Sequence, residues 1–360
     1  MSNSNAKSYA GRALLVSLLL AAPPSPAHAA RAAAAGAQAQ GEQLPEAGVA
    51  QLVERARRGA LGADEFAGAL SVGYALVAGR RFVEAAELFD ALVRARPSDR
   101  AALYGAALAT FNAGRAADAE PLARRAAEAA RAAGRAAGRE RDAADALVLL
   151  AVVLAVRGDG AGALEASAGA AALAPDNFDA RLAHGRALYG AGDDLAAARA
   201  FRAAASLRPG DPRPLFFLAS SLERAGDDAG ALAAYRELAA AQPRAPEGHL
   251  GLGALLVKRG GAEAEEGIGA LLRAVEIDPG LYEARVTLGR ALVARGRAAE
   301  AVEHLRRAAA LAPGNPEPHY QLSLAYRRLG RKEEAAAESA LVKRIHESRR
   351  SGAPPPTPEP

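Results

Sequence analysis

Residues 178–211 read FDARLAHGRALYGAGDDLAAARAFRAAASLRPGD, and this stretch of 34 residues decides the fold. Apolar side chains at helical spacing predict a first helix over 179–191 and a second helix over 195–207. Gly192, between the two, suits the left-handed conformation that ends a helix and turns the chain. Pro209 then stops the second helix, because proline cannot continue the ladder of backbone hydrogen bonds. The stretch therefore predicts two helices joined by a tight turn.

The same pattern recurs along the chain. Asp211 and Pro212 supply an N-cap and a first helical residue for the next helix, and Asn315 and Pro316 repeat this start. Glycines and prolines recur 34 residues apart at Gly158, Gly192, Gly226 and Gly260, at Gly296 and Gly330, at Pro175, Pro209 and Pro243, and at Pro279 and Pro313. A fixed period of this length is typical of a solenoid of stacked repeats, which presents a long surface to a partner.

The period divides most of the chain into repeats with matching small residues. The units are 66–99, 100–133, 144–177, 178–211, 212–245, 246–281, 282–315 and 316–349. The eighth position of each unit is small: Gly73, Ala107, Ala151, Gly185, Ala219, Gly253, Gly289 and Ser323. The twentieth is alanine or glycine: Ala85, Ala119, Ala163, Ala197, Ala231, Gly267, Ala301 and Ala335.

These positions resemble the tetratricopeptide repeat, a helix–turn–helix unit of the same length. The family has a small eighth residue so that the first helix can approach its neighbours, and alanine at the twentieth. The resemblance implies an all-α fold, a right-handed superhelical solenoid of stacked helix–turn–helix repeats over residues 64–349. The tryptophan often found early in the first helix is absent, and Leu215, His249 or His319 takes its place.

The N-terminal residues have the features of a secretory signal peptide. Residues 1–29 begin with Lys7 and Arg12, continue in a short apolar run, and end in Ala27-His28-Ala29, which fits an A-x-A cleavage site. The run of about ten residues is too short to span a bilayer, which takes about 20. We therefore expect export to the periplasm or beyond the cell, with no transmembrane segment after cleavage. An ordinary hydrophobic helix is the alternative. No cysteine is present, which argues against a lipoprotein anchor.

Other segments fall outside the regular repeats. Residues 30–45 are expected to be a flexible leader, 46–63 an N-terminal capping helix, and 350–360 a disordered proline-rich tail that alternatively serves as a ligand for another domain. The insertion 134–143 is expected to lengthen the second helix before it, with a functional protrusion as the alternative. The two extra residues of the Gly260-Gly261 turn are expected to lie on a loop.

The net charge of the chain does not indicate nucleic-acid binding. The chain has 45 Lys and Arg against 41 Asp and Glu, a net charge of +4. Loss of residues 1–29, which hold two basic and no acidic side chains, lowers it to +2. A nucleic-acid-binding domain is expected to be far more basic. The sequence therefore predicts a protein or peptide partner, and it leaves the oligomeric state open.

No pattern of residues indicates catalysis, a metal or a cofactor. There is no HExxH helix, no Cys/His cluster for zinc and no phosphate-binding GxxxxGK motif. Gly251-Leu252-Gly253 falls inside an expected helix and not after a strand, so it is not a dinucleotide loop. His249 and His319 share one slot of the repeat and are explained by packing. Glu263, Glu265 and Glu266 are interpreted as a solvated acidic loop.

The resemblance implies that the first helices line a concave groove that binds partners. The candidate groove residues are Tyr74, Tyr104, Phe111, Tyr189, Phe216, Tyr320, Arg186, Arg224, Lys258, Arg290 and Arg327. Aromatic and arginine side chains are enriched where interfaces gain most of their affinity. We expect a peptide segment whose carboxylates meet the arginines. The alternative is that several of these side chains only pack between helices.

The sequence thus favours a non-catalytic scaffold for protein–protein interaction in the bacterial envelope or secretome. A chaperone-like holder that delivers a substrate to an enzyme or secretion complex is the second hypothesis. An all-helical enzyme is the third. Neither the partner nor the pathway can be named from these residues.

Overall fold

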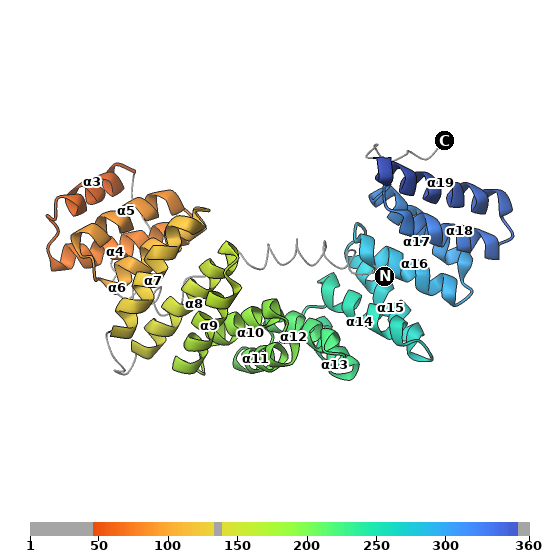
Figure 1. Cartoon of the computed structure of the whole chain (residues 1–360), viewed down its shortest axis with the longest axis horizontal. Coiled ribbons are helices and arrows are strands. Elements are labelled where there is room, and N and C mark those ends of the chain that lie inside the picture. Colours follow the sequence, from red (N-terminus) through yellow and green to blue (C-terminus); the bar gives the residue numbers. More distant parts are fainter. Residues whose placement is uncertain (1–45, 133–138, 352–360) are drawn as a thin grey trace. The chain divides into compact units, whose positions relative to one another are not determined.

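The computed structural model describes residues 46–132 and 139–351, and within these ranges it has seventeen helices and no strand (Figure 1). The expected signal peptide, leader and tail, and residues 133–138 of the insertion, lie outside the described residues. None of the described helices is long and apolar enough to cross a membrane. The chain divides into two compact units, Met1–Pro209 and Gly210–Pro360, each described by itself below.

The first unit contains a single helix followed by four helix pairs. Its described helices are α3 (Glu46–Arg57), α4 (Ala63–Ala78), α5 (Phe82–Ala95), α6 (Arg100–Asn112), α7 (Ala116–Ala132), α8 (Arg139–Arg157), α9 (Gly160–Leu173), α10 (Phe178–Ala191) and α11 (Asp194–Leu207). From α4 onward each helix of this unit packs against the next, and α3 packs against α5. Val49 and Val53 of α3 are buried in the same apolar core as Leu88 and Phe89 of α5.

The second unit contains four helix pairs. They are α12 (Pro212–Arg224) with α13 (Asp228–Ala241), α14 (Pro246–Arg259) with α15 (Glu263–Ile277), α16 (Tyr282–Ala294) with α17 (Ala298–Leu311), and α18 (Pro316–Arg328) with α19 (Lys332–Ser351). A buried cluster from Ile268 to Ala335 joins α15 to α19. In both units the observed pairs of helices confirm the predicted fold class.

Glycine at the eighth repeat position lets the two helices of a pair come close together. A Cβ built at Gly73 would lie 2.6 Å from Cζ of Phe89, and one at Gly289 would lie 2.5 Å from the side chain of Leu305. Both distances are shorter than carbon atoms tolerate without movement. A large second-helix side chain therefore fills the space that the missing Cβ leaves, and close packing holds the pair together.

The turn and cap predictions are confirmed. The Asp211 side chain accepts a hydrogen bond from the backbone N–H of Arg213, and Asn315 accepts one from Glu317. Gly192 ends α10 with φ 85°, a conformation that only glycine adopts at little cost. These contacts satisfy the backbone groups that a helix end leaves open.

Two sequence expectations need correction. Glu263, Glu265 and Glu266 form the first turn of α15 and not a loop, because acidic side chains are stabilised at a helix N-terminus. The insertion lengthens both helices that flank it. α7 has 17 residues against 14 in α9. α8 already begins at Arg139 and has 19 residues, whereas only the preceding helix was expected to grow.

Candidate partner-binding surface on the first helices

The sequence-predicted groove residues all lie on the first helices of the pairs, and they fall into two sets. The first unit holds Tyr74, Tyr104, Phe111, Arg186 and Tyr189. The second unit holds Phe216, Arg224, Lys258, Arg290, Tyr320 and Arg327. Neighbouring first helices contact each other within each unit, for example α8 with α10 and α16 with α18.

In the first unit, two of the predicted aromatic residues are buried. Tyr74 and Tyr104 are each only 7% exposed. The Tyr74 hydroxyl donates a hydrogen bond to the Ala101 carbonyl oxygen at 2.8 Å, which ties α4 to α6. Its ring packs edge-on against Phe89 with centroids 5.1 Å apart. Burial raises the pKa of the Tyr74 phenol well above its ordinary value. Both side chains are buried in the helix stack and leave little surface for a partner.

The remaining members of the first set are partly accessible. Phe111, Arg186 and Tyr189 are half-buried. Arg186 and Tyr189 both take part in polar, charged or ring contacts. None of the three is as open as the exposed members of the second set.

The second unit presents its set more openly. Tyr320 is 50% exposed, and Arg224, Lys258, Arg290 and Arg327 are all exposed. Phe216 is half-buried, and its ring packs edge-on against Phe217 with centroids 5.6 Å apart. We call Phe216, Arg224, Lys258, Arg290, Tyr320 and Arg327 the first-helix surface of the second unit.

Three of the four cations of this surface, Lys258, Arg290 and Arg327, are weakly tied to the rest of the described protein. Lys258 Nζ lies 3.9 Å from Oδ1 of Asp228, and Arg327 Nη2 donates a long hydrogen bond of 3.4 Å to Ser339. Arg290 has no hydrogen bond or ion pair with any described residue. Weak exposed contacts of this kind contribute little to stability and leave the charges available to a ligand.

Charge is arranged along the first helices of the second unit. Glu247, Glu283 and Glu317 lie in the first turns of α14, α16 and α18. Basic residues such as Lys258 and Arg327 lie in the last turns of α14 and α18. The helix dipole favours this order at both ends. In α14 and α18 the acidic side chain therefore lies at the start of the helix and the basic side chains lie at its end.

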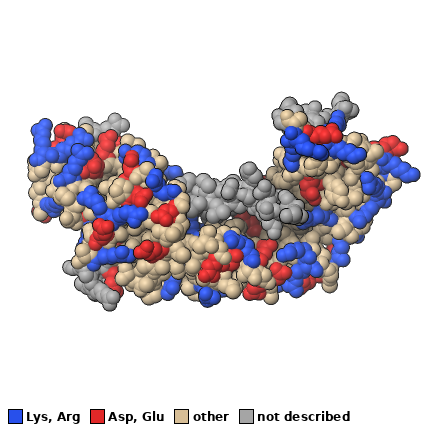
Figure 2. Space-filling model, viewed as in Figure 1, with Lys and Arg blue, Asp and Glu red and all other residues tan. Residues whose placement is uncertain are grey.

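His319 has a structural role, and the described residues hold no group suited to a metal ion. His319 is buried, and its Nδ1 lies 2.7 Å from Oε2 of Glu338, which links α18 to α19. Among the described residues no three His, Cys, Asp or Glu side chains are grouped so as to hold a metal ion. On the face seen in Figure 2, basic and acidic side chains are interspersed over each unit.

Comparison with known proteins identifies the family. The model described as tetratricopeptide repeat matches residues 72–129, 182–246 and 216–282, and one described as TPR repeat matches 289–330. Together these ranges cover more than half of the chain. The comparison with curated proteins finds no match.

Two solved structures show the same fold at low sequence identity, and a third is reported beside them. The C-terminal part of a TPR repeat-containing protein from Cytophaga hutchinsonii gives a TM-score of 0.57 at 13% identity, covering 70% of this chain and 99% of that one. The APC/C hetero-tetramer Cut9–Hcn1 gives 0.50 at 14% identity, covering 78% of this chain and 52% of that one. YrrB, whose structure is described as a TPR protein with an unusual peptide-binding site, gives 0.45 at 19% identity and covers 51% of this chain and 93% of that one. With its repeating small residues, its stacked helix pairs and these family matches, the chain belongs to the tetratricopeptide repeat family.

Proposed function

We propose that this protein is a non-catalytic scaffold that binds a partner polypeptide on the first-helix surface of the second unit. The observation that carries the proposal is the exposure of four basic side chains together with Tyr320, with Arg290 free of any partner among the described residues. An interface commonly gains most of its affinity from a few aromatic and arginine side chains. Tyr320 supplies apolar contact area and a hydroxyl, while Arg290 is available for a carboxylate.

We further propose that the protein acts outside the cytoplasm, in the assembly or tethering of envelope or secreted complexes. The support for this lies in residues 1–29, whose basic start, short apolar run and A-x-A ending fit a signal peptide.

Affinity purification of the exported protein from its own cells tests the proposed surface. Phe216→Ala combined with Arg290→Ala should lower the recovery of a stoichiometric partner by about tenfold, the effect of losing about 1.4 kcal/mol of binding free energy. Arg244→Ala is the matched control, because Arg244 is exposed in the same unit and has no partner among the described residues. Undiminished recovery with the double variant would argue against the surface. Transient capture of many proteins would favour a chaperone-like holder instead.

A further inference from the structure

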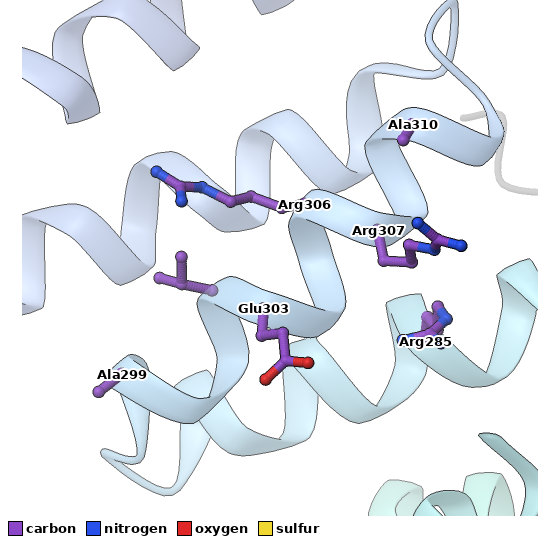
Figure 3. Close-up of a pocket in the computed structure, with 7 residues that line it drawn as sticks. Arg285, Ala299, Glu303, Arg306, Arg307 and Ala310 are labelled. Atoms are coloured by element: carbon purple, nitrogen blue, oxygen red, sulfur yellow. The ribbon is translucent and has the colours of Figure 1, made fainter. Parts of the chain in front are cut away.

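A cationic hollow lies on a different side of the second unit, against the second helix α17. Its volume is about 720 Å³, and its polar lining consists of Arg285, Glu303, Arg306 and Arg307 (Figure 3). Val302 and alanine side chains of α17 supply an apolar part. In Figure 3, Arg285 and Arg307 lie at one side of the hollow and Arg306 at the other.

The hollow is separate from the first-helix surface. Arg285 and Arg290 both belong to α16, but five residues at 100° each place them about 140° apart around the helix axis. α16 thus points one arginine toward the first-helix surface and the other toward the hollow. The two surfaces are therefore open to independent tests.

Arg285 is held in a fixed position by burial and a hydrogen bond, whereas Arg306, whose side chain is 59% exposed, is tethered at its guanidinium group. Arg285 is 8% exposed, and its Nε donates a hydrogen bond of 2.7 Å to the Pro279 carbonyl oxygen. Arg306 donates from Nε to the Tyr326 hydroxyl oxygen at 2.8 Å, and its Nη2 lies 3.7 Å from Oε1 of Glu334. A ligand that meets the Arg285 guanidinium gains a contact whose ordering is already largely complete.

The lining of the hollow holds three arginines and one carboxylate, and Glu334 and Asp278 act on Arg306 and Arg285 from outside the lining. Burial and the nearby charge of Arg307 lower the pKa of Arg285. Arg307 itself makes no hydrogen bond or ion pair within the described part of the chain, and Glu303 is the one acidic side chain among the lining residues. Beside them on α17, Nδ1 of the half-buried His304 is enclosed without a described hydrogen-bond partner. An incoming anion would relieve the repulsion between Arg285 and Arg307.

We propose that this hollow binds an acidic peptide segment of a partner protein, which makes it a second interaction surface of the scaffold. Arginine binds carboxylates with paired, charge-assisted hydrogen bonds, and three arginines surround the hollow. Its volume lies within the range of ligand sites, about 300–1,000 Å³, and is far larger than a single carboxylate or phosphate group would fill. The apolar part around Val302 suits a segment in which apolar residues alternate with acidic ones.

Fluorescence anisotropy with the full chain tests the proposal. The probe is a fluorescein-labelled decapeptide of glutamate, leucine and alanine, and the control peptide has glutamine for every glutamate. We expect the glutamine peptide and the Arg307→Glu variant each to weaken binding by about tenfold or more. Arg307→Gln should weaken it less. Arg244→Gln, at an exposed arginine outside both proposed surfaces, should leave it unchanged.

Side-chain NMR of His304 supplies a local readout that does not depend on affinity. Burial and the charge of Arg285 lower the pKa of His304, so an anion bound at Arg285 should raise that pKa. The proposal is overturned if the acidic peptide does not bind. Equal weakening by Arg307→Gln and Arg244→Gln, or weakening by Arg290→Gln alone, would also overturn it. So would inorganic phosphate that shifts His304 and displaces the peptide at millimolar concentration, since the hollow would then be an ion site.

Discussion

Arg80 takes a backbone conformation that arginine rarely adopts. Its φ is 60°, and it is the one non-glycine residue in the described part of the chain with a positive φ. It stands at the turn position that Gly114 fills in the next repeat with φ 81°. The left-handed region costs a non-glycine residue about 1–2 kcal/mol. The turn geometry of the repeat, and not the preference of Arg80, therefore sets the backbone here.

Replacing Arg80 with glycine should raise stability. The expected gain in the free energy of unfolding is about 1 kcal/mol, and the exposed Arg80 side chain has no described partner to lose. Gly114→Arg, the reverse change at the matching turn, should lower it by about 1–2 kcal/mol. Urea denaturation followed by circular dichroism measures both. An unchanged midpoint for both variants would show that the turns carry no strain.

Two histidines should make the protein less stable in mild acid. Burial lowers the pKa of His184 and of His304 from the ordinary value of 6.5, and nearby Arg181 and Arg285 lower them further. Each histidine is therefore more protonated in the unfolded chain than in the folded one between its lowered pKa and 6.5. Their contribution to stability is complete above pH 6.5 and is lost as pH falls through the folded pKa.

The measurement is the urea midpoint between pH 7.5 and 5. We expect it to fall with pH in the parent protein. The fall should be smaller in the double variant His184→Gln and His304→Gln. His346→Gln, on the exposed face of α19, is the control that should keep the full pH dependence. A double variant as sensitive to acid as the parent would contradict the assignment.

In the helix pair α14 and α15, two glycines, Gly253 and Gly267, face each other at close range. A Cβ at Gly253 would lie 2.7 Å from the Gly267 carbonyl oxygen, and one at Gly267 would lie 2.9 Å from the Gly253 carbonyl oxygen. At each glycine, the backbone of the opposite helix occupies the space that a Cβ would need. A methyl group on either residue would therefore push the two helices apart. By contrast, nothing lies within 4 Å of a Cβ at Gly269, two residues along α15.

The effect of alanine on stability should therefore differ in sign between the crowded glycines and the open one. Gly253→Ala and Gly267→Ala should each destabilise the protein by about 1–3 kcal/mol, the typical result of overpacking. Gly269→Ala should stabilise it by about 0.5–1 kcal/mol, because alanine is the better helix former and space is available. Thermal and urea denaturation of the three variants measure the effects. The same sign for all three would mean that helix propensity and not packing controls this pair.

Much of this packing could be predicted from the sequence. The small eighth residue was expected from the family resemblance, and Gly73 and Gly289 do face large side chains. The sixth position was missed. A Cβ at Gly105 or Gly251 would lie within 2.3 Å of the ring of Phe89 or Tyr235 from the preceding repeat. In both cases the sequence has an aromatic residue at position 24 of one repeat and glycine at position 6 of the next repeat. Comparing these two positions would have predicted the contact.

The exposure of the candidate site was harder to predict than its position in the repeat. Repeat position correctly placed Tyr74 and Tyr320 on first helices, yet one is 7% and the other 50% exposed. The difference arises from neighbours, because Phe89 and the next helix cover Tyr74. The position of a residue within its own repeat does not tell which side chains of neighbouring helices cover it. The cationic hollow was missed for the same reason, since its arginines come from two different helices of the repeat.

At the scale of the whole molecule, the chain consists of two compact units that meet at Pro209 and Gly210. The period of 34 residues predicted one array and gave no sign of this division, because the repeat pattern continues through it. The first-helix surface of the second unit lies wholly within residues 210–360. Its role is therefore testable without knowledge of how the two units are placed.

Photo-cross-linking in the native cells shows whether a partner binds the first-helix surface of the second unit. A photoreactive phenylalanine analogue replaces Tyr320, which is 50% exposed on the first-helix surface, or Arg244, which is exposed in the turn after α13. We predict a discrete cross-link to one partner protein from position 320, reduced about tenfold by Arg290→Ala, and none from position 244. Cross-links of equal yield from both positions, or a cross-link from position 320 that Arg290→Ala leaves unchanged, would contradict the account.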